Sequence, residues 1–99
     1  MIQIVWEFVV REAKVVEFEQ VYSPTGSWAS LFRGSSGFLG TTLWRDTRTP
    51  RRYITIDRWE NAASHAAIRE RFAKAYDALD RDCEGFTETE HQIGAFEQA

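Results

Sequence analysis

Hydrophobic and polar residues alternate along four stretches of the chain. In the first, residues 2–10, both alternating faces carry apolar groups, which is typical of a central strand covered on both sides. Residues 38–46 and 51–59 also alternate and are rich in Thr, Leu, Ile and Trp, so they predict two antiparallel strands joined by a hairpin. Residues 87–96 predict a fourth strand.

Between the first and second strands, residues 13–32 repeat apolar side chains at helical spacing. Pro24 and Gly26 interrupt this repeat, and a continuous helix tolerates neither residue well. We therefore expect a helix that breaks near Pro24 and restarts, with Thr25 or Ser27 as the cap of the second part.

Between the third and fourth strands, residues 62–83 predict one long helix. Asn61 is expected to cap its N-terminus, and Gly85 is expected to stop it. The apolar stripe of this helix starts with His65 and ends with Cys83, while the opposite face is charged and solvated.

The predicted order is strand, helix, strand, strand, helix, strand. This order predicts an α+β fold, a ferredoxin-like βαββαβ plait with a four-stranded antiparallel sheet, as one domain spanning residues 1–99. Two helices cover only one face of such a sheet, yet the strands are apolar on both faces. The sequence therefore predicts a homodimer that packs sheet on sheet.

Composition narrows the possible partners. The chain has 99 residues, of which 14% are aromatic, more large rings than one small core needs, so some rings are expected at an interface or a pocket. A net charge of -3 argues against nucleic acid as a partner. The apolar N-terminal run is interrupted by Gln3 and Glu7, so it predicts neither a signal peptide nor a membrane span. Because Cys83 is the only cysteine, we expect no internal disulfide and a cytoplasmic location.

Four segments in this order resemble the antibiotic biosynthesis monooxygenase family. They are TGSWASLFR after the helix break, GFLGTTLWRD on the second strand, YITIDRW on the third, and Tyr76 followed by LDRDCE on the last helix. The resemblance implies a dimeric α+β barrel with a pocket between each sheet and its helices. That pocket would hold an aromatic or polycyclic substrate, which some members oxidise with dioxygen and without metal or flavin. Other relatives degrade haem, isomerise small metabolites or have no established activity.

His65 is the first candidate for chemistry, because it lies at the start of the last helix near Trp59. A histidine titrates near neutral pH, so at a pocket mouth it could remove a phenolic proton and leave an electron-rich anion that reacts with dioxygen. The alternative is an ordinary histidine at a helix start, bonded to a backbone carbonyl or to water.

Aromatic residues are the candidates for shaping such a pocket, because flat apolar walls with a few polar tips orient ring systems. Tyr76 is the best tyrosine for a polar role, since it lies on an otherwise apolar helix face. The same rings also suit a core or a dimer interface. The predicted pocket residues are Trp28, Trp59, Tyr22, Phe72 and Tyr76.

Asp57 is a carboxylate in the middle of a strand expected to be buried. Burial without a partner would be costly or would raise its pKa. Arg45 and Arg58 are the obvious partners, and a structural ion pair is favoured over a catalytic acid. If Asp57 faces the pocket, it could instead orient His65.

The sequence carries no other chemical motif. His65 and His91 are far apart and lack carboxylates at helical spacing, so no metal site is predicted. No serine lies in a nucleophile motif, and Cys83 near a helix C-terminus is expected to be inert.

The function predicted from these residues is cofactor-independent oxygenation of a small aromatic or quinol-type molecule. His65 would act as the base, Trp59, Trp28 and Tyr76 would shape the cavity, and Arg45 or Asp57 would fix polar groups. A non-catalytic binding or stress-response module of the same fold is the main alternative. A haem-degrading or isomerase relative is a further one, but Trp6 and Glu7 stand in the first strand where haem-degrading members place an Asn.

Overall fold

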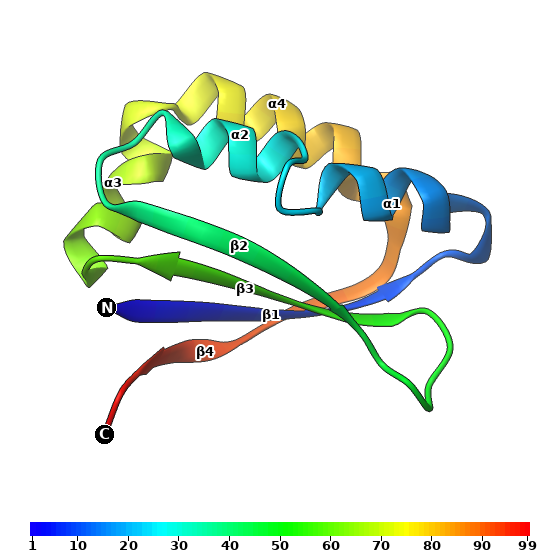
Figure 1. Ribbon diagram of the computed structural model, residues 1–99. Coiled ribbons are helices and arrows are strands. Elements are labelled where there is room, and N and C mark those ends of the chain that lie inside the picture. Colours follow the sequence, from blue (N-terminus) through cyan, green and yellow to red (C-terminus); the bar gives the residue numbers. More distant parts are fainter.

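The computed structural model describes all residues, 1–99, as one layer of helices on one face of a sheet (Figure 1). The strands are β1 (Ile2–Val10), β2 (Phe38–Arg45), β3 (Arg52–Trp59) and β4 (Thr87–Glu97). The α-helices are α1 (Val15–Val21), α2 (Ser27–Arg33), α3 (Ala62–Arg71) and α4 (Ala73–Cys83), and short 3-10 turns, Glu12–Lys14 and Glu84–Phe86, precede α1 and follow α4.

The four strands pair in the order β2-β3-β1-β4, and every pair is antiparallel. The predicted α+β, ferredoxin-like fold is therefore confirmed. β1 is central, as its apolar alternation predicts, but helices cover only one of its faces (Figure 1). That covered face carries Ile4, Phe8 and Val10, which are all buried.

The first helical stretch breaks near Pro24 as predicted, but neither Thr25 nor Ser27 caps the second part. Gly26 is the N-cap of α2, and no side chain caps that end. A Cβ atom on Gly26 would lie 2.3 Å from the carbonyl oxygens of Gln20 and Val21, so the tight turn between α1 and α2 requires a glycine.

The predicted long helix is two helices. Asn61 caps α3 as expected, because its side-chain oxygen accepts a hydrogen bond from Ser64 N at 2.8 Å. The helix then breaks at Phe72, where φ is -122° and ψ is 36°, and α4 continues from Ala73 to Cys83. No proline or glycine marks this break, so helical periodicity alone did not reveal it.

The core has two parts on the helix side of the sheet. The first surrounds Phe8, Phe18, Tyr22 and Tyr53 under α1, and the second surrounds Ile4, Phe32, Trp59 and Ile68 under α2 and α3. Trp6 and Trp28 pack against both parts. The two tryptophans thus mark the line along which the two parts of the core meet.

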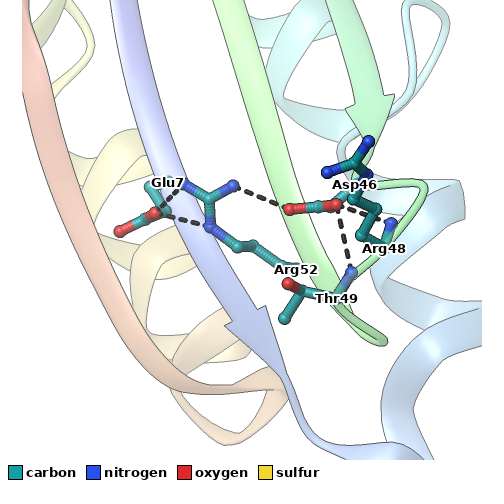
Figure 2. A network of polar contacts seen from close by, with 5 residues as sticks. All are labelled: Glu7, Asp46, Arg48, Thr49 and Arg52. Atoms are coloured by element: carbon teal, nitrogen blue, oxygen red, sulfur yellow. Dashed lines mark hydrogen bonds and ion pairs between the residues drawn. The ribbon is translucent and has the colours of Figure 1, made fainter.

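The opposite face of the sheet carries a charged network (Figure 2). Arg52 Nε donates to Glu7 Oε2 at 2.7 Å, and Arg52 Nη1 donates to Asp46 Oδ2 at 2.8 Å. Hydrogen bonds from the backbone N–H groups of Arg48 and Thr49, together with Arg52, lower the pKa of Asp46 to about 2. The network ties the hairpin between β2 and β3 to β1.

No helix is long and apolar enough to cross a bilayer.

Candidate functional site

A cavity opens between the sheet and the helices, at the line where the two parts of the core meet. It contains about 500 Å³ of space free of atoms, including open solvent at its mouth. Its floor comes from residues of all four strands, and its roof comes from the end of α1, from α2 and from α4. The lining residues are Trp6, Phe8, Tyr22, Trp28, Phe32, Thr41, Thr55, Asp57, Tyr76, Asp80 and Glu90.

Aromatic rings form most of the wall. Trp28 and Tyr76 meet edge to face, with ring centroids 5.1 Å apart, and Trp28 also contacts Phe32 and Tyr22 at 5.8 and 6.3 Å. The buried indole N–H of Trp28 lies near the Tyr22 hydroxyl and the Cys83 thiol. Burial raises the pKa of the Tyr76 phenol. The wall therefore combines flat apolar surfaces with the protonated phenol of Tyr76, which suits a ligand that contains a ring and an oxygen acceptor.

Asp57 is the most perturbed carboxylate of the cavity. It lies on β3, directly opposite Ile4 on β1 and Thr41 on β2. Burial raises its pKa to about 6, and a hydrogen bond from Thr41 Oγ1 to Asp57 Oδ1 at 2.7 Å opposes that rise. A carboxyl group with such a pKa is partly protonated near neutral pH, whereas an ordinary aspartate is almost fully ionised there.

The predicted ion pair of Asp57 is wrong. Asp57 forms no salt bridge, because Arg45 bonds to Glu19 at 3.0 Å and Arg58 lies on the other face of β3. Thr41 is the only hydrogen-bond partner of the carboxylate. The burial of Asp57 is thus balanced by one hydroxyl rather than by a counter-charge.

The sequence matches a known protein family that has this architecture. The model of the antibiotic biosynthesis monooxygenase family matches residues 1–73. This chain belongs to that family. No curated protein matches it.

Three solved structures share the fold. SnoaB from Streptomyces nogalater, a cofactor-independent oxygenase, is 24% identical with a TM-score of 0.73, over 99% of this chain and 92% of SnoaB. A putative antibiotic biosynthesis monooxygenase from Bordetella bronchiseptica is 21% identical with a TM-score of 0.76, over 99% and 96% of the two chains. An uncharacterized NIPSNAP domain protein from Burkholderia xenovorans is 20% identical with a TM-score of 0.72, over 100% and 95%.

Within this member of the family, four of the eight site residues predicted from sequence lie in the cavity wall: Tyr22, Trp28, Asp57 and Tyr76. Trp59, which was expected to shape the cavity, does not line it. Trp59 is fully buried in the second part of the core, where it packs against Phe32 and Phe38 with ring centroids 5.5 and 5.1 Å apart.

His65, Phe72 and Arg45 also lie outside the wall. The His65 ring packs on Trp59 at 5.7 Å, and burial lowers its pKa. Phe72 sits at the break between α3 and α4 and packs against the second part of the core. Arg45 is exposed on β2 and pairs with Glu19. The base role of His65 stays a prediction that the cavity geometry does not support.

The sequence offered signals for some residues of the wall that were not predicted. Trp6 and Phe8 alternate with Ile4 on the covered face of β1, and Asp80 follows Tyr76 by one helical turn. Thr41 and Thr55 share the covered face of β2 and β3. Glu90 had no such signal, because its inward orientation depends on irregularities in the pairing of β4 with β1.

The hydrogen bond from Thr41 makes a testable contribution to the Asp57 carboxyl. Replacing Thr41 by Val removes the donor and keeps the shape, so the pKa of Asp57 should rise above its value of about 6. A carbon-13 NMR titration of the carboxyl group measures it. Thr55→Val is the matched control, because Thr55 also lines the cavity and does not bond to Asp57. An equal or lower pKa in Thr41→Val would contradict the assignment.

No group of three or more His, Cys, Asp or Glu side chains is arranged to hold a metal ion. Cys83 is buried in the first part of the core, and burial raises its pKa. His91 lies on β4 opposite Glu7 of β1, outside the cavity wall.

Proposed function

We propose that this protein is a cofactor-independent monooxygenase that acts on a small aromatic or quinol-type molecule. One observation carries the proposal: Asp57, with a pKa raised to about 6, faces a cavity walled by aromatic rings. Membership of the family and similarity to SnoaB, a cofactor-independent oxygenase, support the reaction type.

In the proposed reaction Asp57 removes a proton from the bound quinol-type molecule. The resulting anion donates an electron to dioxygen, and the two radicals combine to form a carbon–oxygen bond. The resulting peroxide anion takes the proton back from Asp57 to give a hydroperoxide. The hydroperoxide then loses water, as the Asp57 carboxylate removes the remaining proton of the reacting carbon and passes it to the departing hydroxide. For a substrate with a reactive CH₂ group, CH₂ and O₂ become C=O and H₂O, so the atoms and electrons balance without another reductant.

The cavity residues support the proton transfer and the binding of a flat molecule. Burial makes Asp57 a stronger base than an exposed aspartate, so it accepts a proton from a bound ligand more readily. The rings of Trp6, Trp28 and Tyr76 hold a flat molecule in place. Asp57 takes the role of base here instead of His65, because His65 packs on Trp59 and does not line the cavity.

Oxygen consumption tests the proposal. Chelator-treated protein is mixed with dithranol, an anthrone with one reactive CH₂ group, and oxygen uptake is measured with an electrode beside a protein-free control. Uptake that depends on the protein and forms one quinone per dioxygen supports the proposal. Binding of the anthrone without uptake would overturn it and favour a non-catalytic binding module.

We also propose that the protein acts as a homodimer in the cytoplasm. The uncovered sheet face presents Val5, Ile54, Ile56 and Trp44 as neighbours across three strands, and Trp44 is 56% exposed. An apolar face of this kind is rarely left in water. The charges of Glu7, Asp46 and Arg52 on that face already satisfy one another, which lowers the cost of covering them (Figure 2). The single cysteine, which has no disulfide, supports a reducing compartment.

Ile56→Arg tests the dimer, because it puts a charge in the middle of the uncovered face. We expect the wild type to elute at twice the mass of the chain in size exclusion with light scattering, and Ile56→Arg to elute as a monomer. Val16→Arg is the control, since Val16 is exposed on α1, on the helix side. A wild type that is monomeric at all concentrations would contradict the proposal.

A further inference from the structure

All the charged side chains that line the cavity are acidic. Three carboxylates, Asp57, Asp80 and Glu90, line it, and none of its eleven lining residues is Lys, Arg or His. Asp80 and Glu90 form no salt bridge and no side-chain hydrogen bond, in contrast to Glu7, Glu19 and Asp46, which are paired with arginines. Asp80 and Glu90 are both exposed, and partial desolvation, followed by repulsion from Asp80, raises the pKa of Glu90.

The carboxylates lie at two ends of the floor. Asp57 on β3 is level with Ile4 of the neighbouring strand β1, and Glu90 on β4 is level with Phe8 of the same strand. Ile4 and Phe8 are four residues apart, or about 13 Å along the strand. Asp80 and Glu90 therefore mark the end opposite Thr41 and Asp57, and their separation from Asp57 fits the absence of a three-carboxylate metal site.

Aromatic rings fill the space between the two ends. Trp6 lies on β1 between the levels of Asp57 and Glu90, Phe8 lies level with Glu90, and Trp28 and Tyr76 lie above them on α2 and α4. Ring faces attract cations as well as other rings. The Tyr76 ring already accepts one cation in this way, since the Arg69 guanidinium lies 4.9 Å from its centroid, outside the cavity wall.

A second feature of the wall is the phenol of Tyr76, whose pKa is raised by burial, so that it keeps its proton near neutral pH. A phenol hydroxyl can donate to a hydroxyl or carbonyl oxygen on a ring. The wall thus offers a donor and a base for an oxygenated ring, and two unpaired carboxylates beyond it.

We propose that the ligand of this cavity is a hydroxylated aromatic molecule that carries a cationic amine. Its ring lies between Trp6 and Trp28 with the hydroxyl toward Asp57, and its amine lies between Asp80 and Glu90. This inference rests on the proposed function for the hydroxylated ring, which is the end of the ligand that reacts. It adds that the opposite end of the ligand carries a positive charge. The same carboxylates disfavour anionic aromatic molecules.

A matched set of phenols tests the charge. Tyramine, 4-ethylphenol and 3-(4-hydroxyphenyl)propionate share one ring and differ in carrying a cation, no charge or an anion. Their dissociation constants at pH 7.5 are measured by calorimetry and by quenching of tryptophan fluorescence. We expect tyramine to bind at least about 10-fold more tightly than 4-ethylphenol, with the anion weakest, and the advantage to shrink as salt is raised.

Two double variants test whether Asp80 and Glu90 cause the tighter binding of tyramine. Asp80→Asn with Glu90→Gln should remove the advantage of tyramine over 4-ethylphenol. Asp77→Asn with Glu88→Gln changes the charge equally on the same helix and strand but outside the cavity, and it should leave the advantage intact. Equal binding of tyramine and 4-ethylphenol, no binding of tyramine, or an unchanged preference in the first double variant would overturn the inference.

The outcome is distinguishable from that of the proposed function, because binding is measured without turnover. Preferential binding of tyramine in a protein that consumes no oxygen would sink the oxygenase proposal and support the amine. Oxygen uptake with an uncharged anthrone in a protein that binds all three phenols equally would do the reverse.

Discussion

Replacing Asp57 by Asn should lower the turnover number at least about 100-fold, because the amide keeps the shape of the side chain but cannot accept the substrate proton. The wild-type rate should rise with pH and level off above the pKa of Asp57, about 6, since only the carboxylate acts as a base. The residual rate of the variant should not show this rise. Initial rates of oxygen uptake between pH 4.5 and 8.5 measure both effects.

The same variant should be more stable than the wild type at neutral pH. The folded-state pKa of Asp57 lies above its ordinary value of 3.8, so the fold favours the protonated acid, and stability is lost as pH rises from about 4 to about 6. At about 1.4 kcal/mol for each unit of pKa, the cost at pH 7 is on the order of 3 kcal/mol. Urea denaturation should show this gain in Asp57→Asn at pH 7, and the gain should vanish below about pH 4.

Asp77→Asn is the control for both measurements, because Asp77 is exposed on α4 and does not line the cavity. It should change neither the rate nor the stability appreciably. An Asp57→Asn protein that retains more than about a tenth of the wild-type rate would rule out Asp57 as the base. Loss of the rate together with a gain in stability is not expected of a residue that merely supports the fold.

Trp59→Ala should destabilise the protein by about 3–5 kcal/mol, the usual cost of removing a large buried ring. Trp59 is fully buried and contacts Phe32, Phe38 and His65, all in or beside the second part of the core. A domain of this size has only about 5–15 kcal/mol of stability in total, so this loss is a large share of it. Urea denaturation at fixed protein concentration measures the change.

Trp59→Phe keeps a ring at the same site and should lose much less. Its buried indole N–H has no partner in the wild type, so removing that group leaves no broken hydrogen bond. A loss below about 1.5 kcal/mol in Trp59→Ala would contradict the central place given to this residue in the core.

Much of the fold could be predicted from the sequence, because alternation and helical spacing report which face of an element is buried. β1 was predicted with its exact bounds, and Asn61 was predicted as a cap, since both depend on local chemistry. The break at Phe72 was not predicted, because it depends on how α3 and α4 pack on the sheet rather than on a proline or a glycine.

The site was harder to predict for the same reason. Tyr22, Trp28, Asp57 and Tyr76 were predicted from their chemical type, and they lie in the wall. Trp59 and His65 are also an aromatic and a titratable residue, but they pack against each other instead of lining the cavity. Whether a ring belongs to the core or to the cavity depends on tertiary contacts that spacing along the chain does not encode.

The division of the core into two parts affects how this protein can change over evolutionary time. The parts around Phe18 and Trp59 are separate clusters of buried residues, and Trp6 and Trp28 pack against both. Substitutions at the exposed wall residues Asp80 and Glu90 therefore leave the buried contacts of both parts in place. A new ligand specificity can then be acquired by exchanges at these positions, with the stability of the scaffold largely preserved.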